Sequence, residues 1–467
     1  MENQASKTSF VDKIKSAFTS MSKKTKLIAL GAVALVVVII VCAVVASSAG
    51  SYSSDDPALF SEGLLCVKQG KKWGYLGDNG KMKIPAKFDE AYAFAENGLA
   101  LVLDDDEYGY IGKNGKFKID PEFEAAKGFA KNGLAAVMDD GEWGYINSKG
   151  KFVIKAKFDS AETFDENGLA VVSVDGEYGV INKKGDYVVK TKYSHIGSFA
   201  ENGLAVICDG SEYGYVNKKG DVVIKPKFEN ARAFDENGYA TVCDDGEWGV
   251  INKKGDFVVK AKYDEPIYFA DNGLAAVCLD GEYGYVNKKG KMVIDPDYDY
   301  AGMFADNGLA LVFDGDDYGF INKKGKEVIK TKFENADSFD NGNLTGVCVD
   351  GKWGFINKSG KMVIEPQFTN VYGFAANGLA LVEVGNGAYG YINKNGKFVI
   401  NPKFDYAYGF NYSDGYTVVL FGEETRILKK NGKYLGDEDF DEFRMYCEPL
   451  YDFDYDFDYD FDDIIDW

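Results

Sequence analysis

The side chains that could do chemistry here are carboxylates, cysteines and one histidine. The chain of 467 residues carries 74 Asp and Glu, seven Cys and a single His. With only His195 present, which we expect in a surface loop, general acid–base catalysis would depend on carboxylates. Most of these lie in turns that recur along the chain, which favours a structural role over one active site. No nucleophile elbow, phosphate-binding loop or HExxH stretch occurs. We therefore predict no enzyme, no cofactor and no metal site.

An aromatic residue followed by glycine recurs along the chain with a nearly fixed period. Successive pairs are 35 residues apart, except before the last pair, where one residue is inserted. A period of this length is typical of repeat arrays. The aromatic residues of the ten pairs are Trp73, Tyr108, Trp143, Tyr178, Tyr213, Trp248, Tyr283, Tyr318, Trp353 and Tyr389. A half unit at 59–67 precedes them and a decayed unit at 424–436 follows, as expected of the caps of an array.

The sequence of each unit predicts short strands joined by tight turns. In the unit around Trp248, two apolar runs at 239–244 and 247–251 are separated by Asp245-Gly246, a dipeptide typical of hairpins. The turn NKKG and a third run, DFVV, follow. The sequence therefore predicts an all-β fold built from antiparallel meanders of about three to four strands.

The pair itself predicts packing between repeats. Side chains alternate along a strand, so Trp248 and Gly249 point to opposite faces. Glycine then lets a neighbouring backbone or ring approach closely. Because both faces of these strands are mostly apolar, neighbouring units must cover them. We therefore assign the ten aromatic residues to the packing of one repeat against the next.

Four cysteines, Cys208, Cys243, Cys278 and Cys348, share one repeat position, which is mostly apolar elsewhere. Together with Cys66 and Cys447 they make six cysteines outside the apolar run at 27–46, an even number that allows a disulfide framework. Bridges between equivalent sites of adjacent repeats would need Cα atoms within about 7 Å. Stacked sheets lie about 10 Å apart, so we expect mostly free, packed thiols.

Two stretches, KWGYLGDNGKMKIPAKFD at 72–89 and KWGFINKSGKMVIEPQF at 352–368, resemble the WG repeat, also called the KWG repeat, of bacterial surface and secreted proteins. The resemblance extends from residue 59 to about residue 436, with tyrosine in place of tryptophan in six of the ten units. It implies a tandem all-β architecture and assigns no catalytic residue.

Two architectures suit ten to eleven such units. Their strand order is similar to that of a β-propeller blade, but one ring usually holds about 4–8 blades. Ten to eleven units would therefore need an unusually large ring, two rings or an open superhelix. We favour the open superhelix, or solenoid, over closed rings. Ten sheets stacked about 10 Å apart would give this superhelix a length of roughly 100 Å.

An uncharged apolar run at 27–46 precedes the repeats. It is long enough to cross a hydrocarbon core of about 30 Å as a helix. Lysines in the basic segment 1–26 predict a cytoplasmic N-terminus and extracytoplasmic repeats, with 47–58 as a linker. The alternative is a cleavable signal peptide, whose apolar region is typically only about 7–15 residues long.

Beyond the array at 59–436, residues 437–467 form an acidic and aromatic tail. Asp452, Asp454 and Asp456 resemble the start of a calcium loop, but Phe457 stands where that loop needs glycine. A disordered interaction tail is therefore the stronger interpretation. Its candidate contact residues are Tyr451, Phe453, Tyr455, Phe457, Tyr459, Phe461 and Trp467.

The charge of the chain narrows the class of partner. A net charge of −21 disfavours nucleic acid and favours basic partners. The leading hypothesis is a single-pass, membrane-anchored scaffold at the cell surface whose repeats bind a protein or a cell-wall glycan through aromatic rings. The alternative is a structural stalk that presents the acidic-aromatic tail.

Overall fold

The computed structural model describes residues 58–339, 342–410 and 412–446. The predicted membrane segment at 27–46 and the tail aromatic residues from Tyr451 to Trp467 lie outside these residues. Within the described ranges, no helix is long and apolar enough to cross a membrane. The fold of the repeats is all-β, as predicted.

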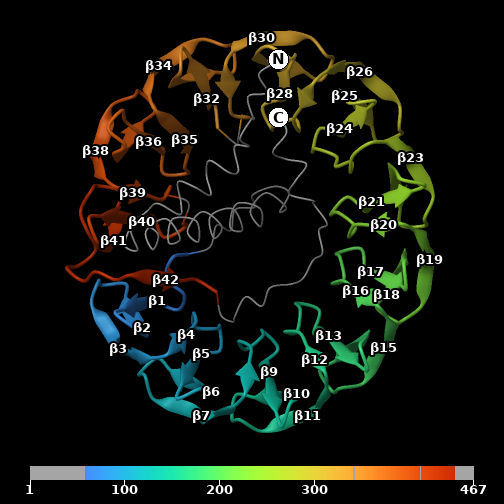
Figure 1. Ribbon diagram of the computed structural model, residues 1–467, viewed down its shortest axis with the longest axis vertical. Helices are drawn as coiled ribbons and strands as arrows, with labels where there is room; N and C mark the ends of the chain where they lie inside the picture. The colour runs from blue at the N-terminus through green and yellow to red at the C-terminus, as the bar shows by residue number, and fades with distance from the viewer. Residues whose placement is uncertain (1–57, 340–341, 411, 447–467) are drawn as a thin grey trace, which may run out of the picture. The chain divides into compact units, whose positions relative to one another are not determined.

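Eleven small antiparallel sheets, here called blades 1 to 11, stand side by side in a closed ring (Figure 1). In blade 2 the hydrogen-bonded order is β4-β5-β6-β7, with the two-residue strand β4 innermost and β7 outermost. Every inner strand except that of blade 1 follows directly after the outer strand of the preceding blade, so the chain returns toward the centre of the ring before each new blade. The first six blades contain, in order, β42 (Glu442–Arg444), β1 (Leu64–Gln69), β2 (Lys72–Gly77) and β3 (Met82–Phe88); β4 (Glu90–Ala91), β5 (Leu99–Asp104), β6 (Glu107–Gly112) and β7 (Phe117–Phe123); β8 (Ala125–Ala126), β9 (Leu134–Asp139), β10 (Glu142–Asn147) and β11 (Phe152–Phe158); β12 (Ser160–Ala161), β13 (Leu169–Val174), β14 (Glu177–Asn182) and β15 (Tyr187–Tyr193); β16 (His195–Ile196), β17 (Leu204–Asp209), β18 (Glu212–Asn217) and β19 (Val222–Phe228); and β20 (Asn230–Ala231), β21 (Tyr239–Asp244), β22 (Glu247–Asn252) and β23 (Phe257–Tyr263).

The remaining five blades follow the same plan, with three strands in blades 7 and 11. They contain, in order, β24 (Leu274–Leu279), β25 (Glu282–Asn287) and β26 (Met292–Tyr298); β27 (Tyr300–Ala301), β28 (Leu309–Phe313), β29 (Tyr318–Asn322) and β30 (Glu327–Phe333); β31 (Asn335–Ala336), β32 (Leu344–Val349), β33 (Lys352–Asn357) and β34 (Met362–Phe368); β35 (Asn370–Phe374), β36 (Leu379–Glu383), β37 (Tyr389–Asn393) and β38 (Phe398–Phe404); and β39 (Tyr406–Ala407), β40 (Tyr416–Phe421) and β41 (Glu424–Lys429). His195 lies in the inner strand β16, so its expected place in a loop is wrong, and burial lowers its pKa.

The glycine of each aromatic–glycine pair lies against its own blade. A Cβ atom on Gly249 would stand 2.6 Å from the backbone nitrogen of Ala261 in the outer strand β23. The pairing of β22 with β23 shifts register around Val250, which marks a β-bulge. The same close approach to the backbone of the outer strand, at 2.5–2.8 Å, occurs at all ten pairs. The close neighbour that the glycine admits is therefore the adjacent strand of the same repeat.

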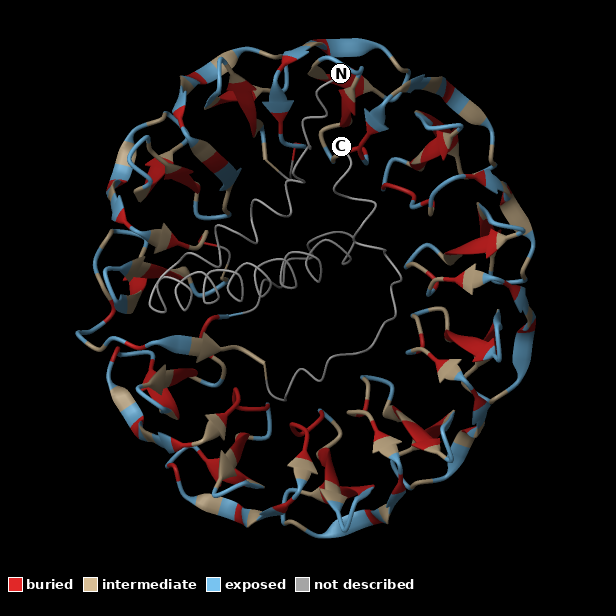
Figure 2. Ribbon diagram, in the orientation of Figure 1, coloured by how far each residue is buried: buried red, intermediate tan, exposed pale blue. Residues whose placement is uncertain are grey.

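The apolar core lies between adjacent blades, and Figure 2 shows the buried residues concentrated in the inner and middle strands. In blade 1, the fully buried Tyr75 donates its hydroxyl to the carbonyl of Tyr92, which belongs to the segment entering blade 2, at 2.8 Å. Its ring centroid is 4.9 Å from that of Phe94. A turn glycine of blade 2, Gly115, packs against Ile84 of blade 1. A Cβ atom added to this glycine would lie 2.9 Å from the Ile84 side chain. Each blade thus covers the apolar face of its neighbour.

The ring closes between blades 11 and 1, so the preferred open superhelix is wrong. Strand β42 pairs antiparallel with β1 and supplies the inner strand of blade 1. The Asp441 amide donates to the Lys68 carbonyl at 2.8 Å, which repeats the bond from Asp89 to Leu103 in blade 2 at 2.9 Å. Small buried residues such as Ala91 occupy the inner strands and large rings lie farther out. Each layer between blades is therefore a wedge, and eleven wedges bring the ends together.

The two atypical ends of the array meet in this closure, where the sequence predicted caps. The half unit at 59–67 contributes β1, and the decayed unit at 424–436 lies in blade 11. Strand β42 falls within the stretch that the sequence assigned to the tail. A signal was present there, because FDEFRMY at 440–446 matches FDEAYAF at 88–94 in its first three residues and in the aromatic residue at its last position.

Candidate binding site

The ten aromatic residues of the pairs differ in how deeply they lie. Trp73 and Trp143 are buried, whereas the other eight, Tyr108, Tyr178, Tyr213, Trp248, Tyr283, Tyr318, Trp353 and Tyr389, are partly exposed. In three blades a cation from the inner segment covers the tryptophan ring of the pair. The Arg444 guanidinium lies 4.2 Å from the ring centroid of Trp73. The Lys127 ammonium lies 6.0 Å from that of Trp143. The Arg232 guanidinium lies 5.9 Å from that of Trp248. The pair aromatics thus pack within the ring and also form part of its surface.

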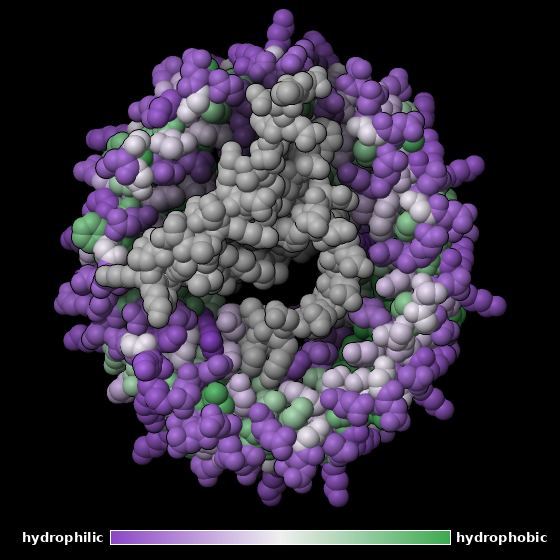
Figure 3. Space-filling model, in the orientation of Figure 1, coloured by the Kyte–Doolittle hydropathy of each residue, from purple (hydrophilic) through white to green (hydrophobic). Residues whose placement is uncertain are grey.

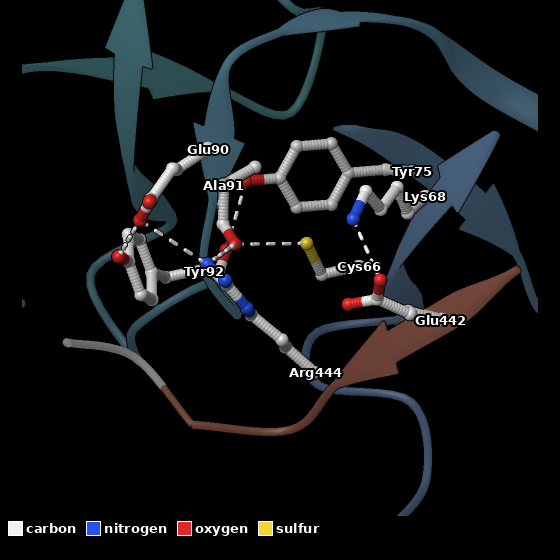
Figure 4. A network of polar contacts seen from close by, with 8 residues as sticks. All are labelled: Cys66, Lys68, Tyr75, Glu90, Ala91, Tyr92, Glu442 and Arg444. Atoms are coloured by element: carbon white, nitrogen blue, oxygen red, sulfur yellow. Dashed lines mark hydrogen bonds and ion pairs between the residues drawn. The ribbon is translucent and has the colours of Figure 1, made fainter. Parts of the chain in front are cut away.

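A polar network joins the first and last strands of the repeat array where the ring closes (Figure 4). Arg444 on β42 contacts the Glu90 carboxylate at 3.5 Å and the Ala91 carbonyl at 3.4 Å. The same carbonyl accepts a bond from the Cys66 thiol at 3.2 Å, and burial raises the pKa of that thiol. Lys68 pairs with Glu442 at 2.6 Å. Because these polar groups bind one another, the network holds β42 to β1 within blade 1 and joins both to β4 of blade 2.

The five described cysteines, Cys66, Cys208, Cys243, Cys278 and Cys348, are free and buried, which confirms the expectation for these five. Burial and the Glu265 carboxylate raise the pKa of Cys278 from 9.0 to about 11. Since the raised pKa favours the protonated thiol in the folded state, its contribution to stability is complete below pH 9.0 and is lost as pH rises through about 11.

We expect iodoacetamide at about pH 8 to leave these five thiols unmodified in the folded protein, because the thiolate is the reactive form. Mass spectrometry after labelling with and without urea checks this. In urea all five should react within the same time. Labelling of Cys278 at equal rates in both conditions would contradict its burial.

Blade 7 breaks the regular pattern of the ring. Where nine other inner segments have alanine, valine or isoleucine, such as Ala231, this one has Pro266, and no inner strand forms. The amide of Ile267 donates to the Thr241 hydroxyl in blade 6 at 3.2 Å. Ile267 is buried in the same apolar cluster as Val250, which stands where most blades have a tyrosine or phenylalanine. The segment is thus drawn toward blade 6 and away from β24.

A pocket of about 170 Å³ lies beside this irregular segment, between blades 7 and 8. Within it the Tyr283 hydroxyl donates to Oε1 of Glu265 at 2.7 Å, and burial together with this carboxylate raises the pKa of Tyr283. The ring centroids of Tyr283 and Tyr300 are 5.9 Å apart. The pocket is lined by Glu265, Pro266, Tyr268, Ala276, Cys278, Tyr283, Tyr300, Ala301, Gly302 and Met303.

Three exposed apolar side chains line this pocket, and a fourth lies on another inner segment. The exposed fractions are 52% for Tyr268, 44% for Tyr300 and 50% for Met303, and that of Tyr372 in blade 10 is 41%. Figure 3 shows hydrophilic residues predominating around the outer circumference, with paler and apolar patches nearer the inside. Of the residues assigned from sequence, only Tyr283 lines the pocket. Its other members were missed, and the signal that could have found them is Pro266, which interrupts the repeat pattern.

Known proteins resemble this chain in repeat sequence and, more remotely, in structure. No curated protein sequence matches it. A crystal structure of a eukaryotic initiation factor has 10% identity and a TM-score of 0.36, over 83% of this chain and 100% of that chain. BamB from Moraxella catarrhalis has 12% identity and a TM-score of 0.27, over 56% and 93%. The extracellular domain of a putative one component system from B. thetaiotaomicron has 11% identity and a TM-score of 0.26, over 80% and 70%.

The repeat sequence matches a family model along most of the ring. Ten consecutive matches to the WG containing repeat cover residues 73–108, 108–143, 143–178, 178–212, 213–248, 248–283, 283–316, 318–353, 353–387 and 389–423. Each begins at the aromatic residue of a pair and ends near the next pair, so the repeat spans the two outer strands of one blade and the two inner strands of the next. The chain therefore belongs to the WG containing repeat family.

Proposed function

We propose that this protein is a binding scaffold that holds a protein or a cell-wall glycan on the aromatic surface of its ring. The observation that carries this proposal is the exposure of Tyr268, Tyr300, Met303 and Tyr372 on inner segments of blades 7, 8 and 10. Exposed ring faces offer large contact areas with few rotatable bonds. Among the described residues only three other aromatic side chains, those of Phe152, Tyr187 and Phe421, are exposed, so the clustering of these four on inner segments favours a role in binding.

We also propose that the protein is anchored in a membrane with its ring outside the cytoplasm, and that it does not catalyse a reaction. The uncharged run at 27–46 and the lysines before it favour a membrane anchor with a cytoplasmic N-terminus and an extracytoplasmic ring. The scaffold needs no cofactor, and its acidic charge favours partners other than nucleic acid.

Closure of the ring argues against the alternative of an extended stalk. Stacking in an open array would have added length with every repeat, whereas β42 returns the last repeat to β1. The eleven blades therefore gather their surfaces around one axis, as an interaction platform does.

Retention on two immobilised probes tests the proposal: insoluble cell-wall glycan, and a lysine-rich protein. The full-length chain in detergent should bind at least one of them. The triple variant Tyr268→Ala, Tyr300→Ala, Tyr372→Ala should bind that probe about tenfold more weakly, because each lost ring removes contact area.

A matched control removes three exposed aromatic residues elsewhere, Phe152, Tyr187 and Phe421, by substitution with alanine. This control should bind like the unaltered chain. Retention on neither probe, or an equal loss in both triple variants, would contradict a binding role for the inner aromatic residues.

A further inference from the structure

We propose that the pocket of blade 7 binds the protonated amine of a lysine side chain presented by a basic polypeptide partner. This inference rests on the proposed binding function and names the chemical class of its ligand. Its elements are the Glu265 carboxylate and the rings of Tyr268, Tyr283 and Tyr300, which line one cavity.

The molecule already binds cations in this way at two other blades. Arg444 lies over the ring of Trp73 and contacts the Glu90 carboxylate. Lys127 likewise lies over the ring of Trp143 and pairs with the Glu162 carboxylate. In both cases the cation comes from the inner segment of the blade and stands between the aromatic residue of the pair and a carboxylate of the next inner segment.

Blade 7 has an aromatic ring and a carboxylate but no cation of its own, and here the carboxylate comes from the inner segment of the same blade. Tyr283 is the aromatic residue of its pair, and Glu265 accepts the Tyr283 hydroxyl at 2.7 Å. At the position of Arg444 and Lys127 stands Ile267, which is buried. Among the residues that the structure describes, no cation lies over the Tyr283 ring and no lysine or arginine pairs with Glu265. A ligand ammonium would therefore supply, beside the Tyr283 ring and the Glu265 carboxylate, the cation that Arg444 and Lys127 supply in their blades.

The lining of the pocket favours an ammonium group over a neutral sugar. It contains no lysine or arginine, and its one charged side chain is Glu265. Tyrosine ring faces attract cations through their quadrupole. A sugar would need several hydrogen-bond donors, yet the only side-chain donors besides the Cys278 thiol are tyrosine hydroxyls, and that of Tyr283 is already directed at Glu265. Met303 and Tyr268, both half exposed, suit the apolar stem of a lysine side chain.

Calorimetric titration of the full-length protein with a hexalysine peptide tests this inference. Glu265→Gln should weaken binding about tenfold, because it removes the charge while keeping the shape of the side chain. Tyr268→Ala should weaken it severalfold and provides a second, independent variant. The matched control is Glu282→Gln, which removes the same charge from an exposed residue of the same blade that does not line the pocket. This control variant should change the affinity for hexalysine less than twofold.

Three results would overturn the inference. An equal loss in Glu282→Gln would mean that hexalysine responds only to net charge. Equal affinity for a hexalysine with acetylated side chains would mean that the amine is not recognised. Binding of a neutral chito-oligosaccharide that Glu265→Gln abolishes would make the pocket a sugar site. If the inner triple variant loses its immobilised partner while Glu265→Gln leaves hexalysine binding intact, the proposed function stands and this inference fails.

Discussion

A chain ended after Gly436 should lose the closed ring, because it lacks β42 and the residues that seat it. Strand β42 supplies the three register pairs with β1, and Phe440 is buried with an exposed fraction of 4% in the cluster that joins blades 11 and 1. Replacing one buried phenylalanine by alanine already costs about 3–5 kcal/mol. The deletion also removes Arg444 from the ring of Trp73, so the expected loss of stability exceeds that range.

Small-angle scattering and thermal unfolding measure this effect. The radius of gyration should rise as blade 1 separates from blade 11, and the unfolding midpoint should fall. The control is a chain ended after Tyr446, which retains β42 and lacks only the stretch beyond it. That control should match the full chain in both measurements. An unchanged radius in the shorter chain would show that the wedge shape of the blades closes the ring without β42.

Replacement of Gly249 by alanine should lower the free energy of unfolding by about 1–3 kcal/mol, the usual cost of forcing atoms into a packed site. The new Cβ would lie 2.6 Å from the nitrogen of Ala261 and 2.8 Å from the oxygen of Val259. Both are backbone atoms, so no side-chain rotation relieves the clash. The bulge between β22 and β23 would have to open, and its hydrogen bonds would lengthen.

The matched control for this substitution is Gly246→Ala in the hairpin of the same blade. Gly246 has a φ of 77°, but a Cβ there meets no atom within 4 Å. Its cost should therefore be the backbone term alone, about 1 kcal/mol. Urea unfolding of both variants measures the difference. A greater loss in Gly246→Ala than in Gly249→Ala would show that turn conformation, and not strand approach, requires the pair glycine.

Much of the local structure was predictable from the sequence. The pattern around Trp248 indicated a strand, an Asp-Gly hairpin and a second strand, and β21 and β22 lie there. The positive φ values of Asp245 and Gly246, 52° and 77°, are those that the hairpin dipeptide permits. These features depend on residues close in sequence, so a short window contains the necessary information.

The pocket was not predictable in the same way. Pro266 shows that an inner strand is interrupted, but not where the freed segment goes. Its displacement depends on the Thr241 hydroxyl in blade 6 and on space beside Val250, both distant in sequence. Only the folded ring places Glu265 next to Tyr283 and Tyr300.

The sequence by itself determined the repeat, its strands and turns and its membership of the WG containing repeat family, because each repeat encodes its own hairpins. The tertiary structure decided that the array is a ring. Closure depends on the angle added by every wedge-shaped layer between blades, which no single repeat reveals. It also depends on the pairing of Lys68 with Glu442 across most of the chain. The same packing left the rings of Tyr268 and Tyr300 exposed while it buried Tyr75.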